Sequence, residues 1–211
     1  MTDAPHPRLD ELIATLVRLR APGGCAWDRE QTHASLVQYL VEESAELVEA
    51  IESGSRDEIV EELGDVLYQV LFHADIAAEA GEFTIEDVAA HMTQKMVGRH
   101  PHVFGDVIAD TADEVVVNWE AIKAVEKPER TSVLDGIPAG MPALALADKT
   151  LGRAAKVGVV PVAAPVPATE ELLGAELLAT VVGARAAGLD AERALRGALR
   201  SLREQVVAAE S

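Results

Sequence analysis

Two stretches of the sequence carry carboxylates at a spacing that places them on one side of a helix. Glu-Glu-x-x-Glu occurs at residues 42–46, and Glu-Glu-x-x-Asp occurs at residues 61–65, after the break Ser53-Gly54-Ser55. At about 100° per residue, each acidic set covers roughly one third of its helix, and apolar residues fill the opposite side. A short turn makes the two helices antiparallel neighbours. Four carboxylates at positions i and i+3 are therefore expected to converge where the helices touch: Glu43, Glu46, Glu62 and Asp65.

These four carboxylates predict a metal site. Unneutralised carboxylates at such distances repel and raise each other's pKa, so the arrangement is unfavourable without a cation. Oxygen ligands alone, with no cysteine and no histidine at ligand spacing, favour a hard divalent ion, Mg²⁺, with Mn²⁺ as a substitute. Two ordinary solvated acidic faces are the alternative, and the repetition of the pattern across a tight turn argues against it. His73, beside the second stretch, is interpreted as a structural histidine rather than a ligand.

Downstream residues could bind a nucleotide next to such a metal. A Mg²⁺ ion with open positions typically meets phosphate oxygens there. The candidates are Lys95, Arg99, Lys123 and Lys127 for the phosphates, and Trp27 and Trp119 for stacking on a base. Each lysine alone could be a solvated surface charge, and Trp27 could instead be a buried plug at the end of a helical bundle. Their role depends on the metal assignment being right.

Composition limits the partners and the compartment. The 211 residues carry 36 Asp and Glu against 18 Lys and Arg, a formal charge of -18, which argues against binding to a nucleic-acid backbone. The single cysteine, Cys25, allows no intrachain disulfide and suits a reducing cytosol. The N-terminus lacks the pattern of a signal peptide, and no apolar run is long enough to span a bilayer. We therefore expect a cytoplasmic protein with no membrane or nucleic-acid partner.

The hydrophobic periodicity predicts an all-α fold. Apolar spacing and capping residues predict helices over residues 9–19, the two acidic stretches, 84–97, 112–126, 141–157 and most of 170–209. Residues 25–33, CAWDREQTH, are expected to form a loop, and Pro161 to Pro167 an extended tether. No segment shows a convincing strand pattern.

Residues 171–205 echo the apolar spacing of residues 61–99 but lack its charges. Glu171-Leu-Leu-Gly-Ala-Glu-Leu aligns with Glu61-Glu-Leu-Gly-Asp-Val-Leu, and Gly188 aligns with Gly81. In this register the residues opposite Glu62, Asp65, Lys95 and Arg99 are Leu172, Ala175, Ser201 and Gln205. A chance alignment of two Ala- and Leu-rich helices is the alternative. We interpret the echo as a half-repeat that packs but does no chemistry.

Taken together, these motifs resemble the MazG-type nucleoside triphosphate pyrophosphohydrolases of the all-α NTP pyrophosphatase superfamily. The resemblance runs from about Leu9 to Val157 through CAWDREQTH, YLVEESAELVEAI, EELGDVLYQVLFHAD, KMVGRHPHVF, NWEAIKAVEK and SVLDGIPAGMPAL. By position it implies metal ligands at Glu43, Glu46, Glu62 and Asp65, helpers at Glu42 and Glu61, and nucleotide contacts at Lys95, Arg99, Trp119 and Lys123. The family usually has Cys-Pro-Trp-Asp where this chain has Cys-Ala-Trp-Asp at residues 25–28, which removes no functional group.

The resemblance also implies an architecture. Residues 1–130 would form the catalytic domain, residues 131–169 a Pro-rich connector with one short helix, and residues 170–211 a degenerate half-repeat of a second such domain. Family members dimerise so that helices of two subunits build the bundle, so a homodimer is expected.

The implied reaction is NTP + H₂O → NMP + PPi, with nucleoside triphosphates of broad specificity as substrates and nucleotide-pool housekeeping as the role. Glu42 or Glu61 would orient or deprotonate the attacking water, and Lys95 and Arg99 would take up charge on the leaving pyrophosphate. Two alternatives remain open: a pyrophosphatase selective for dUTP or phosphoribosyl-ATP, and a non-catalytic nucleotide-sensing protein that kept the fold.

Overall fold

The computed structural model describes residues 6–126, 128–163 and 165–210. They fall into two compact units, Met1–Val115 and Val116–Ser211. Throughout the described ranges the regular structure is helical, without strands, which confirms the predicted all-α fold.

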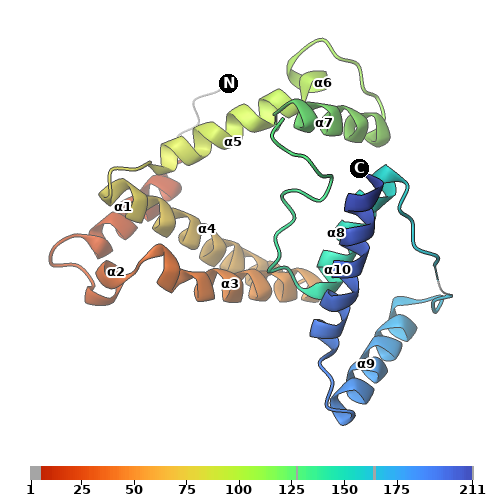
Figure 1. The fold of residues 1–211 in the computed structure, drawn as a ribbon. Coiled ribbons are helices and arrows are strands. Elements are labelled where there is room, and N and C mark those ends of the chain that lie inside the picture. Colours follow the sequence, from red (N-terminus) through yellow and green to blue (C-terminus); the bar gives the residue numbers. More distant parts are fainter. Residues whose placement is uncertain (1–5, 127, 164, 211) are drawn as a thin grey trace. The chain divides into compact units, whose positions relative to one another are not determined.

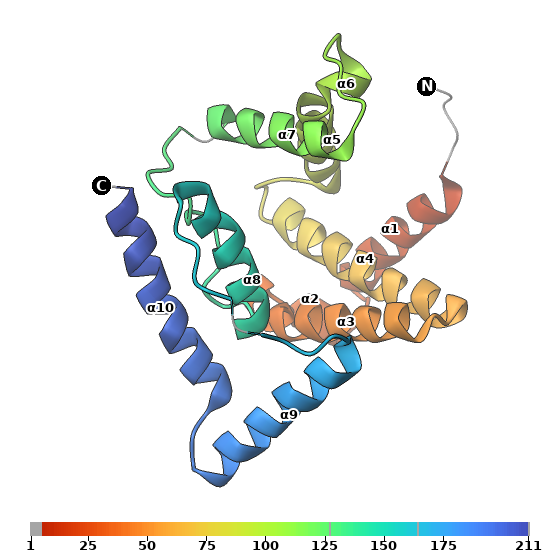
Figure 2. The ribbon, with the colours of Figure 1, turned by 90° about the vertical axis from the view of Figure 1, so that its right-hand side faces the viewer.

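The first unit is built on an antiparallel helix hairpin. Its elements are α1 (Pro7–Arg20), α2 (Ala26–Glu30), α3 (His33–Ser53), α4 (Arg56–Glu79), α5 (Ile85–Arg99), α6 (Pro101–Phe104) and the first residues of α7 (Ala112–Glu126). Helices α3 and α4 lie side by side in both ribbon views (Figures 1 and 2). Gly54, with φ 73°, ends α3, and the Ser55 side chain accepts a hydrogen bond from the Glu58 N–H at the start of α4. This tight turn fixes the register in which the two acidic faces meet.

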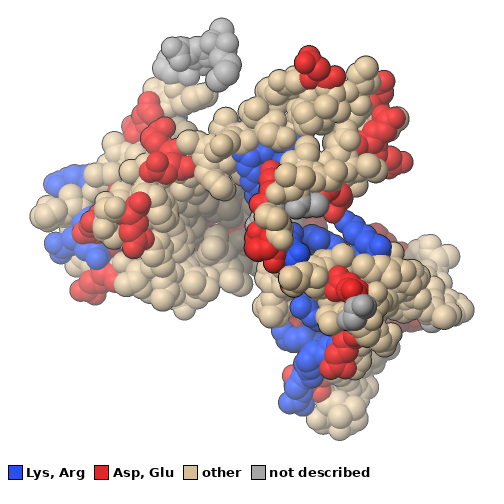
Figure 3. Space-filling view, turned by 45° about the horizontal axis from the view of Figure 1, so that its top comes forward, with Lys and Arg blue, Asp and Glu red and all other residues tan. Residues whose placement is uncertain are grey.

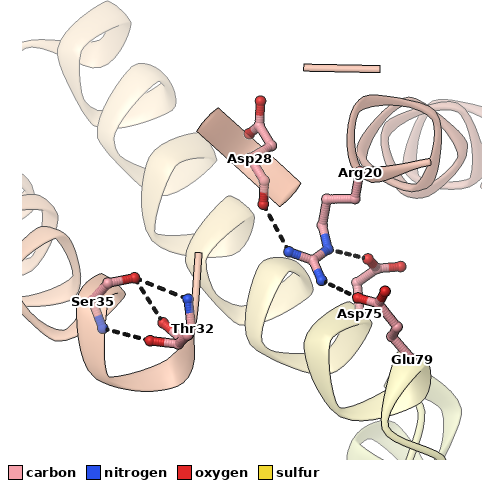
Figure 4. Close-up of polar contacts among 6 residues, drawn as sticks. All are labelled: Arg20, Asp28, Thr32, Ser35, Asp75 and Glu79. Atoms are coloured by element: carbon pink, nitrogen blue, oxygen red, sulfur yellow. Dashed lines mark hydrogen bonds and ion pairs between the residues drawn. The ribbon is translucent and has the colours of Figure 1, made fainter. Parts of the chain in front are cut away.

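The other end of the hairpin is held by α1 and α2. Leu16, Leu36, Leu71 and Phe72 are buried together where α1 packs on α3 and α4. Arg20, at the end of α1, is buried and donates hydrogen bonds to Asp75 (2.6 Å), to Glu79 (2.6 Å) and to the carbonyl oxygen of Asp28 (2.8 Å) (Figure 4). Two carboxylates of α4 and the backbone of α2 are therefore joined by one guanidinium.

One local prediction was wrong. Residues 26–30, expected to lie in a loop, form helix α2. The Cys25 carbonyl accepts the N–H of Arg29, and Arg20 fixes the Asp28 carbonyl from outside. A reciprocal capping box between Thr32 and Ser35 then starts α3 (Figure 4). The short helix is stabilised by contacts distant in sequence, which local patterns do not contain.

The second unit has its own core. It contains the rest of α7, α8 (Ala143–Ala154), a 3₁₀ turn η1 (Ala155–Val157), α9 (Glu170–Ala186) and α10 (Ala191–Ala209). Helices α8 and α10 pack against each other (Figure 1). The buried apolar residues are Leu134, Ile137, Leu146, Ala154, Leu199, Leu202 and Val206. Residues expected to form a connector thus share a core with the C-terminal helix, while the domain boundaries expected at residues 130 and 169 stay predictions.

Two further links join the connector to α10. The Ala143 N–H donates to Glu192 (2.8 Å), and the Val133 N–H donates to Glu210 (2.6 Å). Helix α9, in contrast, has none of its described residues buried and contacts α10.

Within the described residues no single helix is long and apolar enough to cross a membrane, although α9 and α10 reach that length and composition jointly, across a bend of 104°.

Candidate functional site

The α3–α4 hairpin brings carboxylates of the two acidic faces together. Glu43 on α3 and Glu62 and Asp65 on α4 each offer one carboxylate oxygen, and these three oxygens all lie within 4.8 Å of one another. Glu43 and Glu62 are half-buried, whereas Asp65 is exposed. The Asp65 side of the cluster is therefore open to solvent, and the two glutamates are partly covered.

Glu46 lies beside this cluster, one turn along α3 from Glu43. Partial burial raises the pKa of the Glu43 carboxyl, and the Asp65 charge and a hydrogen bond with Glu46 raise it further. Burial likewise raises the pKa of Glu62, followed by the charges of Glu46 and Asp65. All four predicted ligands are thus electrostatically coupled, with three of them within reach of one small cation and the fourth bonded to Glu43.

The donor set fits a hard divalent ion. Glu62 Oε2 is shielded from solvent and has no hydrogen-bond partner within the described residues. A carboxylate oxygen without solvent or a partner is destabilising, and a metal ion would satisfy it. The cluster offers oxygen atoms only, the ligands that Mg²⁺ and Mn²⁺ prefer. Lone acidic clusters are common without a metal, and the orphaned oxygen is the independent observation in favour of one here.

The two predicted helpers lie next to the cluster in sequence. Glu42 and Glu61 are both exposed and precede Glu43 and Glu62 directly. Neither belongs to the group of three converging oxygens, although the Glu61 charge contributes to the raised pKa of Glu62. They stand at the rim, open to solvent.

The predicted phosphate contacts divide between the units. Lys95, half-buried, and Arg99, buried, lie on α5, which packs against α4. Trp119 and Lys123 lie on the part of α7 that belongs to the second unit, where the Lys123 ammonium sits 4.5 Å from the centre of the Trp119 ring. Lys127, a further candidate, lies outside the described residues.

Trp27 is a surface ring and not the buried plug considered as an alternative. It is 49% exposed and stands edge-on to Tyr39, with 5.7 Å between ring centres. Tyr39 lies one turn before Glu43 on α3. An exposed aromatic edge one turn from the acidic cluster is suited to contact a planar base.

Sequence reasoning missed two polar contacts around this site. One is the Arg20 network, which positions α2 and hence Trp27. Its only signal in the sequence was an arginine at the end of an amphipathic helix, together with two acidic residues spaced i, i+4 on another helix. The other joins His33 and His73, whose Nδ1 atoms are 2.7 Å apart in nearly parallel rings. Burial and the nearby His33 lower the pKa of His73, so it is held as a neutral hydrogen-bonding group. The interpretation of His73 as structural agrees with this pairing.

The chain is similar in sequence to several known proteins. The profile of the MazG nucleotide pyrophosphohydrolase domain matches residues 31–104, which span α3, α4, α5 and α6. The chain is 49% identical over 150 residues to a nucleoside triphosphate pyrophosphohydrolase/pyrophosphatase MazG of Thermotoga maritima, covering 71% of this chain and 57% of that protein. It is 43% identical over 207 residues to a nucleoside triphosphate pyrophosphohydrolase of Mycolicibacterium smegmatis, covering 96% of this chain and 59% of that protein.

A third relative is similar over nearly the whole chain. An uncharacterized 26.1 kDa protein of Streptomyces cacaoi is 48% identical over 213 residues, which cover 99% of this chain and 85% of that protein. By contrast, this chain spans less than two thirds of the length of the two enzymes above.

Proposed function

Because this chain belongs to the MazG nucleotide pyrophosphohydrolase family, we propose that it hydrolyses nucleoside triphosphates to monophosphates and pyrophosphate with the help of Mg²⁺. The observation that carries the proposal is the convergence of Glu43, Glu62 and Asp65 around the orphaned oxygen of Glu62. Ribo- and deoxyribonucleotides are both expected as substrates, with Mn²⁺ able to replace Mg²⁺.

The chemistry follows from what each group can do. A bound divalent ion would polarise the α-phosphate and lower the pKa of a water molecule. Glu43, Glu62 and Asp65 would hold it together with Glu46, the predicted fourth ligand, whose carboxylate lies beside that of Glu43. Glu42 or Glu61, at the exposed rim, would accept the proton of the attacking water.

The cationic and aromatic residues would bind the rest of the substrate. Lys95 and Arg99 are suited to neutralise the charge that develops on the leaving pyrophosphate, and Lys123 is a further candidate for a phosphate contact. Trp27 and Trp119 provide rings for the base. A free-standing acidic cluster repels a triphosphate, so these cations are as necessary as the metal.

A homodimer is part of the proposal. On α4 the exposed residues Val60, Leu63, Leu67 and Val70 follow heptad-like spacing, and on α3 Val37, Val41, Val48 and Ile51 do the same. Two such apolar stripes on adjacent helices are the surfaces with which helix hairpins pair into a four-helix bundle. Leu63→Lys should shift the protein toward the monomer in sedimentation velocity, while exposed Glu52→Lys on α3 should leave the dimer intact.

We place the protein in the cytoplasm and assign it no nucleic-acid partner. The 36 acidic and 18 basic residues support the second point, since binding to a phosphate backbone depends on clustered cations. One cysteine and no possible intrachain pair agree with a reducing compartment.

A product-resolved substrate panel tests the activity. The eight common ribo- and deoxyribonucleoside triphosphates, dUTP and phosphoribosyl-ATP would be incubated with the full chain in Mg²⁺, and the products separated by ion-exchange chromatography. We expect equimolar monophosphate and pyrophosphate from most triphosphates, and none in EDTA. Turnover confined to dUTP or to phosphoribosyl-ATP would replace broad specificity by a selective enzyme, and nucleotide binding without pyrophosphate release would replace the enzyme by a sensor.

A further inference from the structure

The second unit contains a cavity in which basic residues converge. It has a volume of about 350 Å³, and its charged lining consists of Lys123, Arg130, Arg153, Lys156, Glu120 and Glu210. They come from α7, from the segment after it, from α8 with η1, and from the end of α10, all within residues 116–211. A volume of this size lies at the lower end of the range for small-molecule sites.

The charge of this lining is opposite to that of the chain. Acidic residues outnumber basic ones two to one in the sequence, 36 against 18, whereas cations outnumber carboxylates four to two around the cavity. On the face drawn in Figure 3, Lys and Arg side chains lie beside Asp and Glu side chains in several places. A concentration of like charges in one hollow is unfavourable unless an anion compensates it.

Both carboxylates in the lining are already engaged. Glu120 accepts a hydrogen bond from Lys156, and its other oxygen lies 3.6 Å from the Lys123 ammonium. The Lys156 hydrogen bond holds the pKa of Glu120 below its usual value, so it stays ionised. Glu210 accepts the N–H of Val133. These two carboxylates therefore neutralise part of the positive charge of the cavity, and neither is hydrogen-bonded to Arg130 or Arg153.

The arginines keep most of their donors available. Arg153 donates one hydrogen bond from Nη1, to the Val133 carbonyl at 3.1 Å. Arg130 forms no hydrogen bond and no ion pair with any residue in the described parts of the chain. Its positive charge contributes to the lowered pKa of the Asp135 carboxyl. Its guanidinium lies so close over Gly136 that a Cβ there would come within 2.5 Å of Nη2. Two guanidinium forks at one cavity, each with several unused N–H groups, match the geometry of phosphate oxygens.

We propose that this cavity binds a phosphate-bearing small anion, either free pyrophosphate or the phosphate chain of a nucleotide, through Arg130 and Arg153 with Lys123 and Lys156. Lys123 is the one member to which the family resemblance already assigns a nucleotide contact; the other three are new. The site goes beyond the proposed reaction, because binding here requires neither the acidic cluster nor a metal.

Calorimetric titration of the full chain in EDTA at low ionic strength isolates this site, since without a divalent ion the acidic cluster repels phosphates. Pyrophosphate, ATP, AMP and sulfate are the probes. We expect saturable binding of one pyrophosphate or one ATP per chain, and much weaker binding of sulfate at equal ionic strength. Tighter binding of pyrophosphate than of ATP identifies the free anion as the ligand, and the reverse order identifies the nucleotide.

Arg130→Gln is the most informative variant, because Arg130 makes no bond that the fold depends on. Loss of a charge-assisted contact should weaken binding about tenfold or more. Arg153→Gln should weaken it similarly, with circular dichroism to check that the unit still folds. Arg185→Gln removes the same charge from exposed helix α9 and should change binding less than about twofold. Glu120→Gln removes a competing carboxylate and should strengthen binding.

Three results would overturn the proposal. They are the absence of saturable binding by the wild-type chain, equal affinity for sulfate and pyrophosphate, and an Arg130→Gln variant that binds as well as Arg185→Gln. None of them depends on whether the protein hydrolyses nucleotides, so failure here and failure of the proposed activity are distinguishable.

Discussion

In the hairpin of α4 and α5, Gly81 adopts φ 72°, and in the hairpin of α9 and α10, Gly188 adopts φ 70°. The hydrogen bonds of the two turns correspond one to one. N–H groups of Ala80, Gly81 and Glu82 donate to carbonyls of Ile76, Ala78 and Ala77, and those of Ala187, Gly188 and Leu189 donate to Gly183, Arg185 and Ala184. Such turns end many helices, but here they also coincide with the sequence echo. They support the proposal that residues 170–211 are a degenerate half-repeat.

The helices that precede these turns differ in the residues that they carry. Helix α4 has Glu62 and Asp65 in the acidic cluster and five buried residues. Helix α9 has Leu172 and Ala175 at the aligned positions, both exposed, and none of its described residues is buried. The same turn therefore forms without the acids. The helices form without these carboxylates, and the carboxylates raise each other's pKa. A bound cation is the best explanation for their presence.

The largest difference between helices α4 and α9 is expected in catalysis. Asp65→Ala removes a carboxylate from the cluster and should lower turnover by roughly 10³-fold, the size of a lost metal contribution of several kcal/mol. Glu176→Ala removes an exposed carboxylate from α9 and should leave turnover unchanged. Pyrophosphate release under saturating Mg²⁺ measures both, and near-normal turnover of Asp65→Ala would exclude the assigned ligands.

The two hairpins should also differ in how strongly they are anchored. Arg20→Met leaves Asp75 and Glu79 without their buried partner, and we expect a loss of about 2–3 kcal/mol in the free energy of unfolding. That value lies below the usual range for buried pairs because the Glu79 side chain is 75% exposed. Arg185→Met on α9 should have almost no effect. Urea unfolding followed by circular dichroism distinguishes them, and equal stabilities would show that Arg20 does not hold α4.

The turns at Gly81 and Gly188 should respond alike to substitution of the glycine by alanine. Gly81→Ala and Gly188→Ala both force a Cβ into the left-handed region, with no atom near enough to clash. Each should destabilise its own hairpin by about 1 kcal/mol. Hydrogen exchange of the amides around each turn reports the local change. A large effect at one glycine and none at the other would break the structural equivalence of the two hairpins.

The smallest expected effect concerns the pH dependence of the metal-free protein. Burial and neighbouring carboxylates raise the pKa of Glu43 above 4.5 in the folded state, so ionisation favours unfolding. The resulting loss of stability is absent below about pH 4.5, grows as the pH rises through the raised pKa, and is complete above it. Glu43→Gln should reduce the loss of thermal stability on going from low to neutral pH in EDTA.

Glu49→Gln, on the same helix, is the matched control for that experiment. It should keep the pH dependence of the wild-type chain, and Mg²⁺ should reduce the dependence in the wild type. Identical melting curves for Glu43→Gln and Glu49→Gln across this range would mean that Glu43 is not electrostatically strained.

Much of this arrangement could be predicted from the sequence, because it depends on local periodicity. The i, i+3 carboxylates, the break at residues 53–55 and the capping residues Thr84 and Thr111 specify helices and faces directly. Contacts between distant residues could not be predicted. Arg20 reaches Asp75 across 55 positions, and the Arg20 contact with Asp28 belongs to a helix expected to be a loop. The basic cavity unites residues from 120 to 210, which share no motif.

The central claim is that the acidic cluster of α3 and α4 holds a divalent ion. Titration with Mn²⁺ followed by electron paramagnetic resonance measures this directly, because bound Mn²⁺ loses the signal of the free ion. We predict saturable binding to the wild-type chain, and binding weakened at least tenfold in each of Glu43→Gln, Glu62→Gln and Asp65→Asn. Glu171→Gln and Glu176→Gln, on α9, should bind Mn²⁺ as the wild type does. Equal Mn²⁺ binding by the cluster variants and the α9 variants would contradict the account.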